Sequence, residues 1–410
     1  MSGPSRDYRL LLLGQTTSQL GAQVSAVAVP LLAVLVLHAS ALQLGAVNAA
    51  GTIAFLLIGL PVGAWTDRWR RRRILIASDL VRAALLATVP LAAALGALSI
   101  AQLVAVSLLV GAARVFFDVG YQSYLPDLLG PDRVLGGNAA METIRSTGQV
   151  AGPGLGGWLV GLVGAADVVV VQAGTFLVSA LSLLGIRHRE APPAPHDGPA
   201  RLRHQIGEGL RFVRGNRVLR GLVLTSALGN FAFAVASSVV IIFMVRDLRL
   251  SPTLIGLITG GGSLAALVAA ALTPRLARTI GSARVVWLPL AVTAPLAVPG
   301  ALARPGWTSW LVLLGTAAGE FGQIVYAITS VSLRQRLCPS RLLGRVNATT
   351  RFLIMGLFPA GALLGGALGQ LVGARVTLLA SFLLVVVSVL PARRALRGAT
   401  EIGDLPAWEG

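Results

Sequence analysis

Long apolar runs separated by short polar stretches make up most of this chain. A helix needs about 20 residues to cross the hydrocarbon core of a bilayer, and most of the runs reach that length. We therefore predict twelve membrane helices, at residues 8–37, 41–65, 74–95, 100–121, 139–162, 168–186, 219–244, 253–272, 285–302, 309–333, 346–371 and 376–390.

The composition agrees with this pattern. Of 410 residues, 55% are apolar and 12% are charged, whereas soluble proteins have about 25% charged residues. The sequence contains no nucleophile–base pair and no cluster of metal ligands. We expect an all-α polytopic membrane protein, not an enzyme, with no cofactor and no bound metal.

The two halves of the chain repeat each other. Gly152 and Gly156-Gly157 recur as Gly361 and Gly365-Gly366, and further matches keep the same order about half a chain apart: Pro131, Arg133, Leu135 and Gly136 recur as Pro339, Arg341, Leu343 and Gly344. Parallel repeats of six helices predict two pseudo-symmetric bundles with a substrate path between them near the bilayer midplane.

A proline-rich stretch at residues 191–195 separates the two halves. Residues 206–214 follow it and have the pattern of a short amphipathic helix that could lie on the membrane surface. The predicted domains are an N-terminal six-helix bundle (1–187), a cytoplasmic linker with the short helix (188–217), a C-terminal bundle (218–395) and a cytoplasmic tail (396–410).

All 34 basic residues are arginines. Four of them fall on one side of the predicted membrane (Arg246, Arg249, Arg304 and Arg375), Arg82 and Arg114 lie within helices, and the others fall on the opposite side. By the positive-inside rule, both termini are cytoplasmic in a cell (inner) membrane. This distribution indicates contact with membrane lipids and not with nucleic acid.

The chain has no lysine, so it lacks the residue with which a P-loop reaches the phosphates of ATP. Uphill transport would then draw on an ion gradient or on another subunit.

Five arginines and one aspartate lie between the second and third apolar runs. The pattern G-x-x-x-D-R-x-x-R-R comprises Gly63, Asp67, Arg68, Arg72 and Arg73. It resembles the loop between helices 2 and 3 that is typical of the major facilitator superfamily of transporters, although many members have a glycine near Arg70 and Arg71.

The resemblance implies that this loop helps to hold the cytoplasmic side shut. Two intrahelical pairs at i, i+3 spacing, Asp79–Arg82 and Glu142–Arg145, could extend the charge network around it. The alternative is that these side chains snorkel to the membrane interface.

The fifth predicted helix carries the pattern G-x-x-x-G-P-x-x-G-G, formed by Gly148, Gly152, Pro153, Gly156 and Gly157. It resembles a motif of the drug/proton antiporter branches of the superfamily. A dinucleotide-binding interpretation fails because no βαβ unit surrounds the glycines. The alternative is close helix packing, with a bend at the proline.

Charged residues also fall deep inside two predicted helices. Glu320 lies near the middle of the tenth helix, with Gln323 on the same face, and an unpaired acid at that depth is costly unless it is protonated or faces water. Arg114 and Asp118 are four residues apart in the fourth helix, where the resemblance implies an arginine that contacts substrate or couples to protons. The alternative for each is a structural role.

Polar stripes in the first and seventh helices include Gln19 and Asn230. In the superfamily, helices 1, 4, 7 and 10 line the central cavity, although each amide could instead join neighbouring helices. Residues 208–212 and 344–348 look like the branch that contains macrolide-efflux proteins and the enterobactin exporter.

From these features we predict a secondary transporter that exports amphipathic small molecules by proton-coupled alternating access. One alternative is uptake or facilitated passage of a metabolite. A second, of a different class, is a membrane sensor or scaffold that moves nothing.

Overall fold

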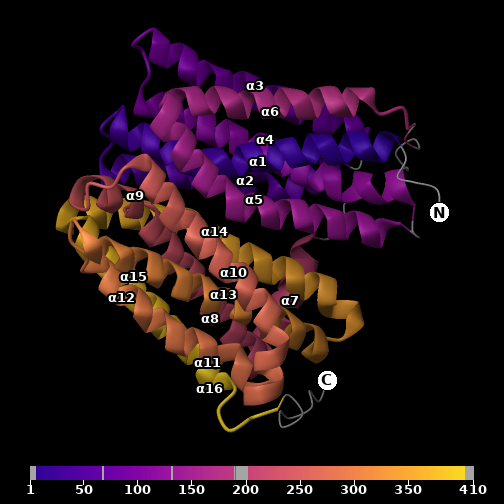
Figure 1. The fold of residues 1–410 in the computed structure, drawn as a ribbon. Helices are drawn as coiled ribbons and strands as arrows, with labels where there is room; N and C mark the ends of the chain where they lie inside the picture. Colours follow the sequence, from indigo (N-terminus) through magenta and orange to yellow (C-terminus); the bar gives the residue numbers. More distant parts are fainter. Residues whose placement is uncertain (1–5, 67–68, 131–132, 189, 191–201, 402–410) are drawn as a thin grey trace. The chain divides into compact units, whose positions relative to one another are not determined.

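A computed structural model describes residues 6–66, 69–130, 133–188, 190 and 202–401. Within these ranges the regular secondary structure is entirely helical, and eleven helices are long and apolar enough to cross a membrane (Figure 1). The chain divides into two compact units. The first comprises Met1–Asp197 with Leu250–Gly260, and the second comprises Gly198–Arg249 with Gly261–Gly410.

Six helices form most of the first unit: α1 (Arg6–Leu35), α2 (Ala41–Thr66), α3 (Arg71–Ala94), α4 (Ile100–Leu129), α5 (Val134–Val163) and α6 (Ala165–Gly185). Helix α1 packs against both α5 and α6, while α4 packs against α2 and α3. One apolar core of this unit surrounds Tyr124, Leu125 and Leu183.

The second unit contains α7 (Leu202–Gly215), α8 (Arg217–Ser237), α9 (Val240–Ile242), η1 (Phe243–Asp247), α10 (Pro252–Ile280), α11 (Arg284–Thr293), η2 (Ala294–Ala297), α12 (Val298–Ala301), η3 (Trp307–Ser309), α13 (Trp310–Leu337), α14 (Ser340–Val372), α15 (Ala374–Ser388) and α16 (Leu390–Ala395), with the beginning of α10 assigned to the first unit. Helix α8 packs against α14 and α15, as α1 packs against α5 and α6. The helix pairing therefore follows the repeat seen in the sequence.

Matching glycines of the two units make the same close approach to a neighbouring helix. A Cβ atom on Gly156 would lie 2.5 Å from the Val24 carbonyl oxygen of α1, and one on Gly365 would lie 2.4 Å from the Val235 carbonyl oxygen of α8. Only glycine lets the backbones meet at these positions, because any side chain would collide with the neighbouring helix.

The observed helices match the predicted segments, with differences at several ends. Helix α4 continues to Leu129, eight residues beyond the predicted end at residue 121, because Tyr124, Leu125 and Leu129 are buried in the core of the first unit. The predicted ninth helix is interrupted by η2, where Pro295 removes a backbone donor from the helical pattern.

The short helix predicted at residues 206–214 is part of α7, which begins at Leu202 and ends at Gly215. Its Phe212 and Val213 are buried against Cys338, Leu342 and Val346. This face of α7 therefore packs onto the start of α14 and is not free to lie on a membrane surface.

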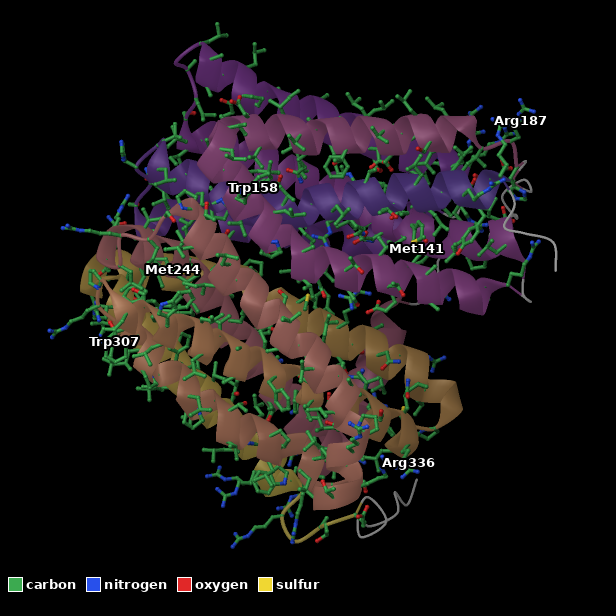
Figure 2. All side chains as sticks on the ribbon, in the orientation of Figure 1. Met141, Trp158, Arg187, Met244, Trp307 and Arg336 are labelled. Carbon is green, nitrogen blue, oxygen red and sulfur yellow. The ribbon has the colours of Figure 1, made fainter. Side chains whose placement is uncertain are left out.

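Three labelled residues mark the two ends of the second unit. Trp307 and Met244 lie near one end, and Arg336 lies near the other (Figure 2). Trp307 is exposed at the start of a spanning segment, which is the position where tryptophan anchors a helix at the membrane interface.

Candidate functional site

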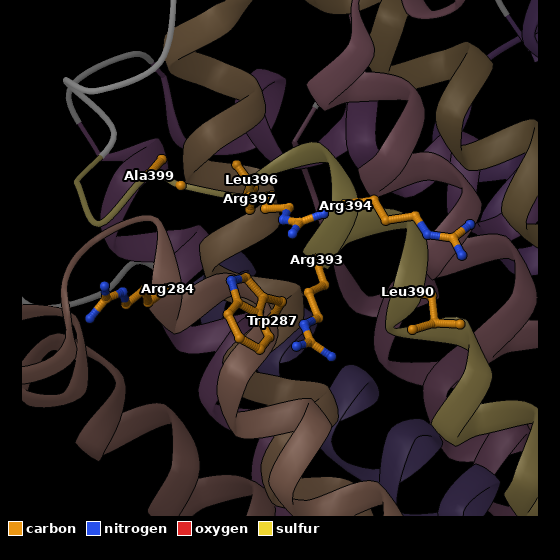
Figure 3. A pocket seen from close by; sticks show the side chains of 9 residues that line it. Arg284, Trp287, Leu390, Arg393, Arg394, Leu396, Arg397 and Ala399 are labelled. Atoms are coloured by element: carbon orange, nitrogen blue, oxygen red, sulfur yellow. The ribbon is translucent and has the colours of Figure 1, made fainter.

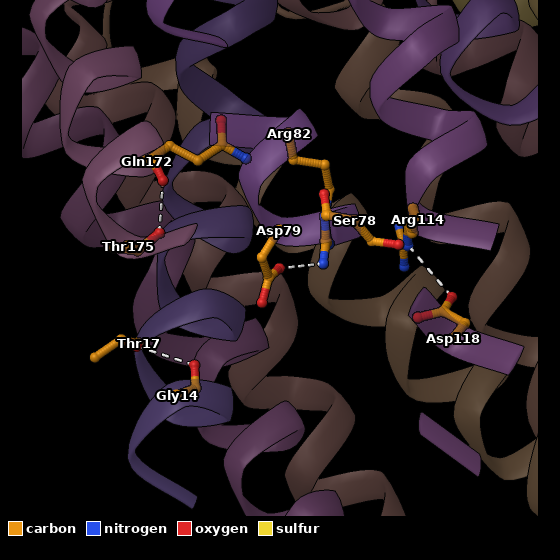
Figure 4. Close-up of polar contacts among 9 residues, drawn as sticks. All are labelled: Gly14, Thr17, Ser78, Asp79, Arg82, Arg114, Asp118, Gln172 and Thr175. Carbon is orange, nitrogen blue, oxygen red and sulfur yellow. Dashed lines mark hydrogen bonds and ion pairs between the residues drawn. The ribbon is translucent and has the colours of Figure 1, made fainter. Parts of the chain in front are cut away.

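The Asp79–Arg82 pair of α3 lies inside the first unit. Asp79 is fully buried, Arg82 is 6% exposed, and an Arg82 Nη2 atom donates to Asp79 Oδ1 (Figure 4). The guanidinium also lies 4.4 Å from the ring centre of Phe117 and 4.3 Å from that of Phe176. Arg82 therefore does not snorkel to the interface, because an aspartate and two aromatic rings hold it in the helical core.

The second carboxylate oxygen of Asp79 has no hydrogen-bond partner among the described residues. The stability of a buried carboxylate with one unsatisfied oxygen depends strongly on the cation beside it, because an uncompensated charge in the protein interior is costly. Movement of α3 away from α4 and α6 would also remove Arg82 from its two rings, so the pair links these three helices.

Arg114 and Asp118 form an ion pair on α4, with 3.6 Å between Arg114 Nε and Asp118 Oδ2 (Figure 4). Their side chains are 72% and 47% exposed. Both charges act on Arg82, which Asp118 attracts and Arg114 repels. An exposed pair thus lies within electrostatic reach of a buried pair.

The loop that resembles the superfamily motif is only partly described. Gly63 lies in α2, while Asp67 and Arg68 fall outside the described residues. On the far side of the loop, the Trp69 ring stacks on Phe116 of α4 with ring centres 6.5 Å apart. Both aromatic rings line an apolar groove of about 840 Å³ that α3 and α4 form.

Arg72 and Glu190 join the ends of α3 and α6. The backbone N–H groups of Arg71 and Arg72 donate to the two Glu190 carboxylate oxygens at 2.7 and 2.5 Å. The Arg72 side chain donates to the carbonyl oxygens of Leu183 and Leu184, each at 2.8 Å. The Glu190 carboxylate thus accepts from free N–H groups at the N-terminus of α3. The Arg72 side chain donates to free carbonyl groups at the C-terminus of α6.

Sequence reasoning missed Glu190 and its neighbour His188. The His188 N–H donates to Asp7 of α1 at 2.9 Å, and its ring lies 3.1 Å from Asp127 of α4. The residues after α6 therefore connect four helices of the first unit at one end. No periodic signal marks them, because they follow a helix and bond to residues more than 60 positions away.

Glu142 and Arg145 form an exposed pair on α5. Arg145 donates through both Nε and Nη2 to the Glu142 carboxylate, the former at 2.9 Å. No described ion pair connects them to Asp79 or Arg82. The two pairs predicted to extend the charge network are therefore separate among the described residues, one on α3 and one on α5.

The glycine motif of α5 is in contact with α1. A Cβ atom on Gly148 would lie 3.4 Å from Gln23 Cγ and 3.7 Å from the Gln19 carbonyl oxygen, and Gly152 is closer still to Gln23. Gly156 faces Val24, and Pro153 is buried in the same helix. Gly157 faces a different neighbour, Gly256, in the segment that belongs to the first unit.

Glu320 lies in α13 of the second unit and is half-buried. Its carboxylate makes no hydrogen bond or ion pair with any residue that the structure describes, and the Cγ atom lies 3.6 Å from the Cβ position of Gly262 on α10. With a rise of about 1.5 Å per residue, Glu320 is roughly 20 Å from the start of the spanning segment and roughly 25 Å from its end. It therefore lies near the midplane of the bilayer.

The face of α13 that carries Glu320 continues toward α8. Gln323 is exposed, and its Oε1 atom is 3.9 Å from the Cβ position of Gly229. Tyr326 follows, buried, with its hydroxyl donating to the Leu222 carbonyl oxygen at 2.5 Å and bonding to Ser226 at 3.0 Å. Asn230 is engaged elsewhere, since its amide donates to the Ile354 carbonyl oxygen of α14 at 2.7 Å.

Comparison with known proteins decides the family. The chain matches the description "Major Facilitator Superfamily" over residues 11–359. The chain is a member of the major facilitator superfamily. It is therefore a multi-pass membrane transporter of small molecules and not an enzyme.

Two relatives illustrate its place in the superfamily. The multidrug efflux pump Tap of Mycolicibacterium fortuitum is 30% identical over 403 residues, which cover 94% of this chain and 96% of that protein. The enterobactin exporter EntS of Salmonella choleraesuis is 27% identical over 270 residues, covering 65% and 62% of the two chains.

Solved structures of other transporters share the fold. A bacterial homologue of the iron transporter ferroportin, in its inward-facing state, superposes with a TM-score of 0.74 at 18% identity, covering 96% of this chain and 99% of that one. The nucleoside transporter NupG gives a TM-score of 0.73 at 15% identity, covering 97% and 100%. At these identities the likeness concerns the fold alone.

Proposed function

We propose that this chain exports amphipathic small molecules in exchange for protons, with both termini in the cytoplasm. The observation that carries the proposal is Glu320, an acid near the bilayer midplane without a described partner. A carboxyl group in such an environment favours its neutral form, because burial in a low dielectric destabilises the charge. It becomes charged when water or a cationic ligand reaches it, so it can take up a proton on one side and release it on the other.

Alternating access supplies the change in environment that this role needs. In transporters built from two repeats, one bundle rocks against the other and exposes the same site to each side in turn. Under the proposal, a proton enters from outside, the substrate leaves, and the proton is released when the site next faces the cytoplasm.

Arg114 and Asp118 are the second part of the proposed mechanism. Their side chains are exposed within a membrane-spanning helix, where a charged pair is stable only if it faces water or protein and not lipid. We assign Arg114 and Asp118 of the first unit to substrate contact or proton coupling.

The proposed outward direction of transport is supported by two similar proteins. Tap is an efflux pump and EntS is an exporter, and both are similar to this chain over most of their length. Amphipathic substrates agree with α4 and α13, which combine apolar and aromatic residues with the charged Arg114 and Glu320.

The test is efflux of a fluorescent lipophilic cation from cells, with and without a proton uncoupler. Wild-type protein should lower dye retention, and the uncoupler should abolish the effect. Glu320→Gln should lose at least tenfold in uncoupler-sensitive efflux, because the amide cannot exchange the proton. Asp167→Asn is the matched control, since Asp167 is an exposed acid at the start of α6.

Size-exclusion profiles should show that both variants fold. Wild-type efflux rates in Glu320→Gln would overturn the coupling assignment. Dye accumulation in place of exclusion would favour an uptake transporter, and dye binding without flux in reconstituted vesicles would favour a sensor.

A further inference from the structure

Four arginines gather around one pocket in the second unit. Arg284 comes from the first turn of α11, Arg393 and Arg394 come from the last turn of α16, and Arg397 follows α16 (Figure 3). The pocket has a volume of about 460 Å³, and Trp287 also lines it. The Arg393 guanidinium lies 5.5 Å from the ring centre of Trp287.

The walls of this arginine pocket are fixed by hydrogen bonds. The Ala283 N–H donates to the Thr400 carbonyl oxygen at 2.9 Å, which closes the loop after α16 onto the start of α11. On the opposite wall, Arg217 of α8 donates to the Arg394 carbonyl oxygen at 3.0 Å. Gly398 turns the chain between these anchors with a φ of 89°, which favours glycine. The pocket is therefore preformed.

No acidic side chain neutralises the four guanidinium groups among the described residues. The nearest acid along the chain, Glu401, is engaged with Ser282, accepting from its backbone N–H at 3.2 Å and from its hydroxyl. The guanidinium groups of Arg284 and Arg394 point away from those of Arg393 and Arg397 (Figure 3). Four arginines around one pocket still create a positive potential, which would attract an anion that enters it. The planar guanidinium group of arginine presents several N–H donors that match the oxygens of a phosphate group, whereas the ammonium group of lysine acts as a point charge.

An apolar stripe leads away from the pocket along the preceding helix. Leu383, Val387 and Leu390 are exposed at spacings of four and three residues, so they lie on one face of α15 and its continuation into α16. Leu390 belongs to both the stripe and the pocket lining. A ligand that uses both surfaces has a phosphate at one end and a hydrocarbon chain at the other.

We propose that the arginine pocket binds the headgroup of an anionic phospholipid, with an acyl chain along Leu383, Val387 and Leu390. Four cations favour a lipid with two phosphates, such as cardiolipin, over one with a single phosphate. The site lies at the end of a spanning segment, where the charged headgroups of a bilayer are found. The proposal does not depend on the direction or the coupling of transport.

Native mass spectrometry of the full-length protein tests the proposal. Detergent-solubilised protein is incubated with cardiolipin, phosphatidylglycerol, phosphatidylcholine or inorganic pyrophosphate. We expect retention in the order cardiolipin, phosphatidylglycerol, phosphatidylcholine. Arg393→Gln/Arg397→Gln should lower the cardiolipin affinity at least tenfold, and Leu383→Gln/Val387→Gln should lower it by a smaller factor.

The matched control is Arg278→Gln/Arg336→Gln, which removes the same charge from exposed helix ends outside the pocket. It should leave cardiolipin retention unchanged. Equal losses in the control and the pocket variant would overturn the proposal, because net charge alone would then explain binding. Tight pyrophosphate binding that cardiolipin does not displace would also overturn it, in favour of a soluble anion.

A pocket variant that failed to fold would be replaced by Arg284→Gln/Arg397→Gln, which leaves α16 intact. A cardiolipin affinity within twofold of wild type, in this variant or in Arg393→Gln/Arg397→Gln, would show that the pocket does not bind the lipid.

Discussion

The interiors of the two units are stabilised by different chemistry, although their helices pair in the same order. In the first unit, α3 carries a buried ion pair, Asp79–Arg82, held between two aromatic rings. In the second, the buried polar centre described on α13 is a neutral phenol, Tyr326, whose hydroxyl bonds to Leu222 and Ser226.

The difference predicts that removing a charged side chain from the interior lowers the stability of the first unit more than that of the second. A buried ion pair loses the solvation of both partners and often contributes less stability than an apolar pair of the same size, whereas a satisfied neutral hydroxyl has no comparable cost. We infer that the first unit keeps its pair for a conformational role near Arg114 and Asp118. Glu320 of the second unit has no described partner, which is what the proposed proton coupling requires.

Breaking the ion pair from one side should give the largest effect. Arg82→Leu leaves Asp79 buried without its cation, and we expect a loss of about 3–5 kcal/mol in unfolding free energy. Thermal unfolding of the purified protein in detergent measures the change. Asp79→Leu/Arg82→Leu should recover most of the loss, and equal melting temperatures for the single and double variants would contradict the assignment.

The close helix contacts should respond alike in the two units. Gly152→Ala and Gly361→Ala each place a methyl group against the backbone of a neighbouring helix, and we expect about 1–3 kcal/mol of destabilisation from overpacking. The controls are Gly154→Ala and Gly344→Ala, in the same two helices, where a Cβ atom meets open space. Thermal stability lost in the controls but not at Gly152 and Gly361 would refute the packing role.

One buried tyrosine in each unit allows the hydrogen bonding of the two interiors to be compared. Tyr326→Phe removes a hydroxyl with two partners, so we expect a loss of about 1–2 kcal/mol. Tyr124 of the first unit is buried with an unsatisfied hydroxyl, so Tyr124→Phe should be neutral or slightly stabilising. The comparison fails if Tyr124→Phe is the more harmful of the two in a melting experiment.

We expect the smallest loss of stability where Glu190 bonds to the N-terminus of α3. Glu190→Gln keeps the shape of the side chain but removes its charge from the N-terminus of α3, and we expect a loss of about 1 kcal/mol. Glu142→Gln removes the charge from an exposed pair on α5 and should cost about 0.5 kcal/mol or less. Equal shifts in melting temperature for the two variants would show that Glu190 does not cap α3.

The sequence predicted the features that depend on local spacing. Apolar runs located the helices, and the repeated glycines marked where α5 and α14 approach their neighbours. It did not predict contacts between residues distant in the chain. Phe117, for example, lies under Arg82 in the core. Glu190 and Tyr326 each bond across more than 100 positions, which no periodic pattern reveals.

Proton movement in proteoliposomes is the most direct test of the central claim. An imposed pH gradient should drive wild-type protein to concentrate a lipophilic cation, and a pH-sensitive dye should report proton movement in the opposite direction. We predict that Glu320→Gln still exchanges substrate down its own gradient but cannot use the pH gradient to concentrate it. Wild-type concentration of the substrate by Glu320→Gln under the same gradient would contradict the account.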